Sequence, residues 1–172
     1  VGEKYPETFD PEVPKDLVYT GKYRLTDTVK GCPLTVGKLV LSPTRTYAPV
    51  VRAMLQEHRG DIRGMIHCSG GGQTKILHFI DKLHVVKDNL FETPLLFRII
   101  QRESQTPWRE MYSVFNMGHR MELYVDSEAV ADDLIRISKS FGVDAQVVGR
   151  VEAADKASVT ITHQNGTFDY YK

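Results

Sequence analysis

The stretch with the clearest chemical potential is Gly64–Lys75, which reads GMIHCSGGGQTK. Its pattern predicts a short apolar strand that ends in three consecutive glycines, with a helix starting near Gln73 or Thr74. Glycine is unfavourable inside strands and helices, so three in a row indicate a tight turn or a close approach to the backbone. A glycine loop that opens a helix also presents free N–H groups at the positive end of the helix dipole. Such a loop suits phosphate or another anion.

His67, Cys68, Ser69 and Lys75 flank the glycines. Two interpretations stay open: a tight turn without a ligand, and an anion site to which these side chains contribute. The spacing matches neither GxxxxGK[ST] nor GxGxxG. His67 is the candidate functional histidine, because it ends a strand beside a loop, where binding residues concentrate. Cys68 adjoins a helix start, which can lower a thiol pKa, but an inert buried cysteine is the simpler interpretation.

The remaining residues form no recognisable catalytic or metal-binding set. No pair among the six histidines has the HExxH spacing of a zinc helix, and no nucleophile elbow is visible. A second stretch, Trp108–His119, reads WREMYSVFNMGH. Its apolar residues at helical spacing favour a core helix, and its Asn-Met-Gly turn favours a helix end with Gly118 left-handed.

The bulk composition describes an ordinary globular chain. The 172 residues suggest one domain, and a formal net charge of +0 gives no electrostatic case for nucleic acid or an anionic membrane. No apolar run approaches the roughly 18–20 residues of a membrane span. Cys32 and Cys68 lack metal-type spacing, so free thiols in a reducing cytoplasm are expected. Because the chain begins Val-Gly without an initiator Met, we expect a processed form or a piece of something longer.

The N-terminal part is the least regular. Three prolines in the first 14 residues argue against a long helix there. Leu17–Val29 could form two short strands about Gly21, or an extended arm lying on a partner. Thr35–Leu41 could be a short strand or a loop. A helix is expected to start with Ser42 as N-cap and Pro43 in its first turn, and to end near Arg59-Gly60.

Strands and helices then alternate. We expect strands at Ile62–Cys68, Leu83–Val86, Arg120–Val125 and Ala145–Val151, and a hairpin at Val159–Tyr170 turning at Asn165-Gly166. We expect helices at Thr74–Ile80 and at Pro94–Glu103, and a third helix with Thr106 as its cap. A fourth helix follows Asp126 and ends at Gly142. Its apolar stripe consists of Val130, Leu134, Ile137 and Phe141. This order predicts an α/β fold: a mixed sheet layered with helices, with the hairpin as its antiparallel edge.

Three segments in order resemble one known family. They are Pro43-Thr44-Arg45-Thr46-Tyr47, His67-Cys68-Ser69-Gly70-Gly71-Gly72, and the run from Glu110 to Gly118 that ends Phe-Asn-Met-Gly. They resemble the PTRxY, HxxGGG and EMxxxFNMG stretches of aminoimidazole ribonucleotide synthetase, also called phosphoribosylformylglycinamidine cyclo-ligase. The resemblance runs from about Leu41 to about Val151, and its FNMG segment is the most specific. His119-Arg120 and Cys68-Ser69 depart from the residues that are usual in the family.

The resemblance implies a single C-terminal synthetase-type domain over residues 1–172, with residues 1–40 as an irregular lead-in and the N-terminal ATP-binding domain absent. It implies ATP-driven closure of the imidazole ring in purine biosynthesis, in the cytoplasm, with a small ribonucleotide as substrate and a homodimeric parent. ATP and Mg²⁺ would bind mainly to the N-terminal domain, so the isolated fragment is expected to be inactive. His67 is the catalytic candidate. The substrate- or phosphate-binding candidates are Arg45, Gly70, Gly71, Gly72, Lys75, Asn116 and Gly118.

Two other functions remain alternatives. The chain could belong to a different ATP-dependent enzyme of the same superfamily, with another substrate. It could also be a stand-alone domain that binds a phosphate group or another subunit without catalysis. The full open reading frame would separate the enzyme from the stand-alone domain, and an assay with formylglycinamidine ribonucleotide would separate the two enzymes.

Overall fold

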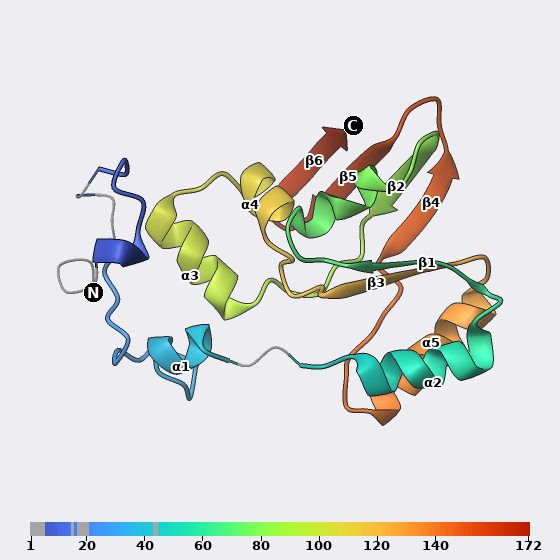
Figure 1. Ribbon diagram of the computed structural model, residues 1–172, viewed down its shortest axis with the longest axis horizontal. Helices are drawn as coiled ribbons and strands as arrows, with labels where there is room; N and C mark the ends of the chain where they lie inside the picture. The colour runs from blue at the N-terminus through green and yellow to red at the C-terminus, as the bar shows by residue number, and fades with distance from the viewer. Residues whose placement is uncertain (1–5, 15, 17–20, 43–44) are drawn as a thin grey trace.

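The computed structural model describes residues 6–14, 16, 21–42 and 45–172 (Figure 1). Its helices are η1 (Pro6–Thr8), α1 (Val36–Val40), α2 (Ala48–His58), η3 (Gly72–His78), α3 (Leu95–Ser104), α4 (Trp108–Val114) and α5 (Glu128–Ser140). Its strands are β1 (Ile62–His67), β2 (Leu83–Lys87), β3 (Met121–Val125), β4 (Gly149–Ala153), β5 (Ser158–His163) and β6 (Gly166–Tyr171). The α/β fold class is confirmed.

The strands form two sheets. The larger has the order β4-β2-β5-β6, in which β2 and β5 run parallel and the other neighbours run antiparallel. The expected mixed sheet is therefore confirmed, and so is its antiparallel hairpin edge, where Gly166 adopts a φ of 124° in the turn. β1 and β3 form a separate antiparallel pair, with Met65 opposite Leu123.

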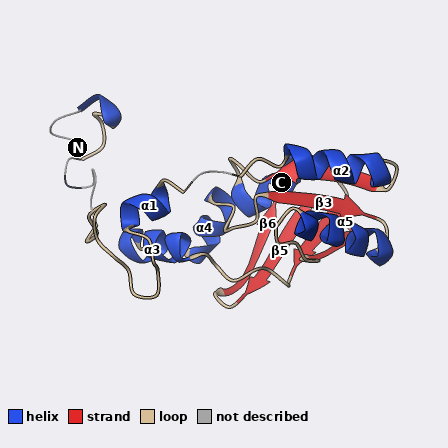
Figure 2. Cartoon of the chain, turned by 90° about the horizontal axis from the view of Figure 1, so that it is seen from below, coloured by secondary structure: helices blue, strands red, loops and turns tan. Residues whose placement is uncertain are grey.

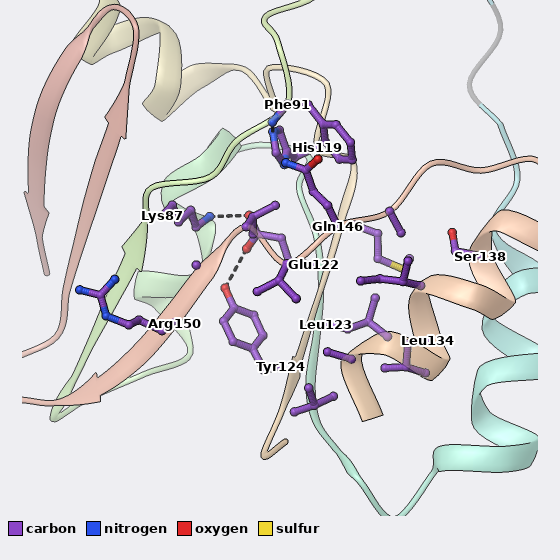
Figure 3. A pocket seen from close by; sticks show the side chains of 18 of the residues that line it. Lys87, Phe91, His119, Glu122, Leu123, Tyr124, Leu134, Ser138, Gln146 and Arg150 are labelled. Atoms are coloured by element: carbon purple, nitrogen blue, oxygen red, sulfur yellow. Dashed lines mark hydrogen bonds and ion pairs between the residues drawn. The ribbon is translucent and has the colours of Figure 1, made fainter. Parts of the chain in front are cut away.

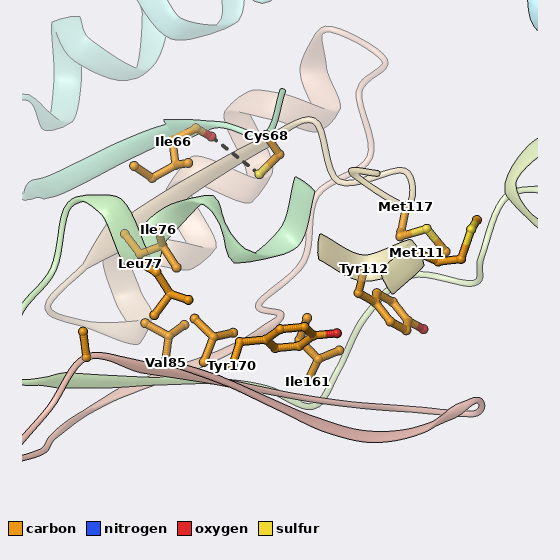
Figure 4. Close-up of a cluster of buried hydrophobic side chains, with 12 residues drawn as sticks. Ile66, Cys68, Ile76, Leu77, Val85, Met111, Tyr112, Met117, Ile161 and Tyr170 are labelled. Atoms are coloured by element: carbon orange, nitrogen blue, oxygen red, sulfur yellow. Dashed lines mark hydrogen bonds between the residues drawn. The ribbon is translucent and has the colours of Figure 1, made fainter. Parts of the chain in front are cut away.

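The main core lies on one face of the four-stranded sheet, under η3 and α4. Figure 4 shows Ile76 and Leu77 of η3 pointing towards Val85 and Tyr170 of the sheet. Val159 on β5 is fully buried in the same cluster. The alternation of apolar residues along β5 places one face of the strand in this core.

A second core joins β1 and β3 to helices α2 and α5, which lie side by side (Figures 1 and 2). Its buried residues are Val50, Met54, Leu134 and Ile137. The helix α5 starts after Asp126, as expected, and Ser127 caps it by accepting a hydrogen bond from the N–H of Val130 at 3.3 Å. β3 thus contributes Tyr124 to the main core and Leu123 to the second.

Two predictions near the N-terminus are wrong. Residues Val36–Val40 form a helix rather than a strand or loop, because the Thr35 hydroxyl accepts a hydrogen bond from the N–H of Lys38 and caps it. The next helix begins at Ala48, not at Ser42, and the proline of its first turn is Pro49. Pro43 and Thr44 lie outside the described residues, as do residues 17–20 of the expected strand pair. The described remainder of that pair has one isolated bridge, from Thr28 to Thr35.

Other boundaries shift. The strand expected over Ala145–Val151 starts at Gly149. The Val148 carbonyl accepts the N–H of Asp88 in register and also that of Asn89, so the regular pairing with β2 ends there. The helix after the glycines is a 3₁₀ helix that begins at Gly72. Thr106 does not cap α4, because its hydroxyl bonds that of Ser104. Phe141 is 47% exposed and does not join the α5 stripe.

The longest helix among the described residues is α5, with 13 residues, and no helix in this part of the chain is long and apolar enough to cross a bilayer.

Candidate functional site

The three glycines lie between the end of β1 and the start of η3, as expected, but each has a different environment. Gly71 has a φ of 91°, and Gly72 has a φ of 49°. A Cβ on Gly72 would lie 2.5 Å from the carbonyl oxygen of Phe115, so this glycine lets η3 pack on α4. A Cβ on Gly70 would have no atom within 4 Å. The fold therefore explains Gly71 and Gly72 as a turn, while it gives no reason for glycine at position 70.

Gln73 ties the glycine loop to the Asn-Met-Gly turn. Its side chain is fully buried, and its Nε2 donates a hydrogen bond to the carbonyl oxygen of Asn116 at 2.5 Å. The Lys87 ammonium donates to the carbonyl oxygen of Gln73 at 2.6 Å. These bonds bring together two motifs that lie more than 40 residues apart in the sequence.

A buried ion pair stands behind this connection (Figure 3). Lys87, at the end of β2, donates to the Glu122 carboxylate of β3, and the two side chains are 2% and 6% exposed. The Tyr124 hydroxyl donates to the other oxygen of the same carboxylate at 2.7 Å. Burial and the nearby Glu122 carboxylate raise the pKa of the Tyr124 hydroxyl, so the phenol keeps its proton. A buried charge needs this kind of full pairing, because breaking the pair leaves an uncompensated charge.

Two further groups of this region are neutral. Burial lowers the pKa of His119 to about 4, and its Nε2 accepts a hydrogen bond from the N–H of Phe91 at 3.2 Å. Burial, helped by the nearby Glu122 carboxylate, raises the pKa of Cys68 to about 12. Cys68 is therefore a thiol at neutral pH, which supports the interpretation as an inert buried cysteine.

The predicted site residues do not all lie together. His67 is exposed at the end of β1, and Lys75 donates to the Ser69 hydroxyl at 2.6 Å, so both flank the glycine loop. Arg45 donates to the carbonyl oxygen of Gly142, at the far end of α5, at 3.2 Å. The contacts described for Arg45 thus connect it to α5 rather than to the loop.

The Asn116–Gly118 turn is held by its own residues. The Asn116 side chain accepts a hydrogen bond from the N–H of Gly118 at 2.9 Å. Gly118 has a φ of 98°, as predicted, and a Cβ there would lie 2.9 Å from the ring of Pro94. Among the described residues, no cluster of three His, Cys, Asp or Glu side chains could hold a metal ion.

A cavity of about 650 Å³ lies between β3 and β4, next to the ion pair (Figure 3). Gly118 is the only predicted site residue that lines it; His67, Lys75 and the three glycines do not. Sequence reasoning missed Gln73, Lys87, Glu122 and Tyr124. The available signal was a lysine and a glutamate inside the otherwise apolar runs LHVVK and MELYV.

The fold and the two connected turns define the class of protein. It is an α/β domain with a mixed sheet, in which buried polar side chains join a glycine turn to an Asn-Met-Gly turn. The sequence profile described as "AIR synthase related protein, C-terminal domain" matches residues 24–162, and the chain belongs to this family.

Several curated relatives are named phosphoribosylformylglycinamidine cyclo-ligase. The protein of that name from Methanocaldococcus jannaschii is 37% identical over 117 residues, which cover 68% of this chain and 33% of the relative. Those from Methanopyrus kandleri and Carboxydothermus hydrogenoformans are 35% and 34% identical, over 77% and 83% of this chain and 36% and 41% of theirs. The chain thus spans between a third and about two fifths of the length of these relatives.

Proposed function

We propose that this chain is the C-terminal part of an ATP-dependent cyclo-ligase that converts formylglycinamidine ribonucleotide to aminoimidazole ribonucleotide in purine biosynthesis. The observation that carries the proposal is the membership of residues 24–162 in a family whose matched relatives are named as this ligase. Two of the three motifs that resemble the ligase, the glycine loop and the run from Glu110 to Gly118, are joined through the Gln73 side chain. We expect the reaction to take place in the cytoplasm, in a homodimeric parent protein.

In the proposed reaction, ATP supplies a phosphoryl group to the formyl oxygen, the amidine-side nitrogen attacks the formyl carbon, and phosphate leaves as the ring closes. This chain would bind and orient the anionic groups of the ribonucleotide. Lys75 and the exposed backbone at Gly70 are the groups on the glycine loop that suit an anion. His67, exposed beside them, is the candidate for proton transfer.

ATP and Mg²⁺ would bind mainly to the N-terminal domain of the ligase, as the resemblance to the family implies. Among the described residues, no group of three His, Cys, Asp or Glu side chains could hold a metal ion. Gln73 and Lys87, both buried, hold the backbone of the loop in place.

The test is an assay of the protein expressed from its full coding sequence. Purified protein is supplied with formylglycinamidine ribonucleotide and Mg-ATP, and both aminoimidazole ribonucleotide and ADP are quantified. One ADP released for each imidazole formed is the expected result. ATP hydrolysis that depends on a different acceptor would indicate another enzyme of the superfamily, and protein that binds phosphate groups without turnover would indicate the stand-alone domain.

A further inference from the structure

A line of buried hydrogen bonds runs from β3 through β2 to the two turns. It starts at the Glu122 carboxylate, which accepts from the Lys87 ammonium, and Figure 3 shows these two side chains pointing towards each other. The same ammonium donates to the main-chain carbonyl of Gln73 at 2.6 Å and to the side-chain Oε1 of Gln73 at 3.3 Å. These contacts use every N–H group of the ammonium, so Lys87 is fully occupied inside the protein.

Lys87 determines which way the Gln73 side-chain amide faces. Because an ammonium offers donors only, Oε1 must face Lys87, and Nε2 then points the other way. Nε2 donates to the carbonyl oxygen of Asn116 at 2.5 Å, and the same oxygen accepts from the N–H of His119 at 2.9 Å. Gln73 is fully buried, so water does not compete for its amide. The line therefore reaches the Asn-Met-Gly turn with a fixed direction.

The line ends at the Asn116 side chain. Its Oδ1 accepts a hydrogen bond from the N–H of Gly118 at 2.9 Å, which leaves the Nδ2 amino group as the outward-facing donor. Within the described part of the chain nothing accepts from Nδ2, and the side chain is half-buried. An amide donor that the fold holds but does not use suits an oxygen of a polar ligand.

The Gln73 bond sets the orientation of the Asn116 peptide, whereas the packing of Gly72 on Phe115 only brings the two segments together. The direction of the Asn116 carbonyl in turn limits the directions that the Asn116 side chain can take. A binding group displaced by about 1 Å can cost roughly 100-fold in rate, so a small rotation of this peptide is enough to weaken a contact with the substrate.

We propose that Gln73, with Lys87 and Glu122 behind it, is a positioning residue that orients the Asn116 amide towards an oxygen of the ribonucleotide. This inference rests on the proposed function. Gln73 acts through Asn116 and takes no part in proton or phosphoryl transfer.

Steady-state kinetics of the protein expressed from its full coding sequence test the proposal. Gln73→Met keeps the length of the side chain and removes its bond to Asn116, while Lys87 stays paired with Glu122. The KM for formylglycinamidine ribonucleotide should rise about tenfold or more, with the KM for ATP unchanged. The control is Gln101→Met in α3, which removes a similar bond from Nε2 to the carbonyl oxygen of Thr106 at 3.2 Å. It should leave both KM values unchanged.

A double-mutant cycle shows whether Gln73 acts through Asn116. Asn116→Asp keeps an acceptor for the N–H of Gly118 and replaces the Nδ2 donor with a carboxylate oxygen. Adding Gln73→Met to Asn116→Asp should raise the KM for the ribonucleotide no further. Effects of the two substitutions that simply multiply would overturn the proposal, and so would equal KM values for Gln73→Met and Gln101→Met.

A second variant covers the case in which Gln73→Met does not fold, as its urea denaturation would show. The Lys87→Met, Glu122→Leu double variant releases the Gln73 amide and leaves no charge unpaired. The same selective rise in the KM for the ribonucleotide is expected, and an unchanged KM would overturn the proposal.

The wild-type protein separates this inference from the function on which it rests. Wild-type protein that does not turn over the ribonucleotide would overturn the proposed function and the positioning role together. Active wild-type protein whose KM for the ribonucleotide is unaffected by Gln73→Met would overturn the positioning role alone.

Discussion

At the scale of single residues, a substitution at Gly70 distinguishes a ligand-binding loop from a turn without a ligand. A Cβ there would meet nothing within 4 Å, whereas Gly71 and Gly72 adopt positive φ and are needed for the fold. Gly70→Ala should therefore leave the urea midpoint of unfolding nearly unchanged. If a substrate phosphate approaches the loop backbone, the methyl group should raise the KM for the ribonucleotide or lower kcat in the full-length enzyme.

Gly71→Ala provides the comparison for this measurement. Alanine at a φ of 91° should cost roughly 1 kcal/mol of stability whether or not a ligand binds. Two results together would argue that the three glycines serve only the turn. The kinetics of Gly70→Ala would be unchanged, and phosphate would raise the melting temperature of neither the variant nor the wild type.

The buried pair of Lys87 and Glu122 makes a second prediction at this scale. Glu122→Ala removes the carboxylate that pairs the buried ammonium, so the free energy of unfolding should fall by roughly 3–5 kcal/mol. In a Lys87→Met, Glu122→Leu double variant no charge is left unpaired, so most of that loss should be restored. Urea denaturation measures both.

An exposed ion pair is the control for this effect. Glu92 pairs with Arg98 at 2.8 Å, and their side chains are 74% and 45% exposed. Glu92→Ala should change the free energy of unfolding by less than about 1 kcal/mol. A similarly small loss for Glu122→Ala would mean that the Lys87 ammonium reaches water in solution.

The lowered pKa of His119 predicts how the stability of the protein depends on pH. Its pKa in the folded protein, about 4, lies below the ordinary histidine value of 6.5, so the unfolded chain binds the proton more readily. The stability that neutral His119 provides is complete above about pH 6.5 and is lost as the pH falls towards 4. Between pH 7 and pH 4.5 the loss should be roughly 2–3 kcal/mol.

The control for the His119 prediction is His119→Gln, which cannot titrate but keeps an acceptor for the N–H of Phe91. Burial also lowers the pKa of His163, and that contribution is present in both proteins, so it cancels in the difference. Stability curves of the two proteins that run parallel between pH 7 and pH 4.5 would contradict the assignment.

At the scale of secondary-structure elements, α5 determines how the two-stranded sheet is covered. Leu134 is 5% exposed and packs with Val50, Met54 and Ile137 between α2 and α5. Leu134→Ala should lower the free energy of unfolding by roughly 2–5 kcal/mol, the range for buried leucines. Phe141→Ala, at the exposed end of the same helix, should change it by less than about 0.5 kcal/mol. Equal midpoints for the two variants would place this face of α5 in water.

At the scale of the whole molecule, these residues match only part of the ligases to which they are related. The 172-residue chain by itself should not cyclise formylglycinamidine ribonucleotide, because it matches between a third and about two fifths of the length of those relatives. The protein from the full coding sequence should do so. Turnover by the 172-residue chain, shown to be free of host ligase by a mock purification, would contradict this division.

The sequence by itself determined the features that depend on neighbouring residues. The Ser127 cap, the Asn165-Gly166 hairpin and the strand that runs into the glycine loop are all encoded within a few positions. Local rules also misled: Ser42-Pro43 resembles a helix start, yet the helix begins at Ala48. The residue types in the glycine loop pointed to an anion site, but not to the different environment of each glycine.

Only the tertiary structure decided which distant residues meet. Lys87 and Glu122 lie 35 residues apart on strands of different sheets, and Lys87 also bonds the carbonyl of Gln73 in η3. Neither residue follows a motif, because a buried ion pair is defined by its surroundings and not by spacing along the chain. The positions of β3 and β4 at the edges of their sheets are likewise a product of strand order, since the same local pattern fits an edge strand and a central one.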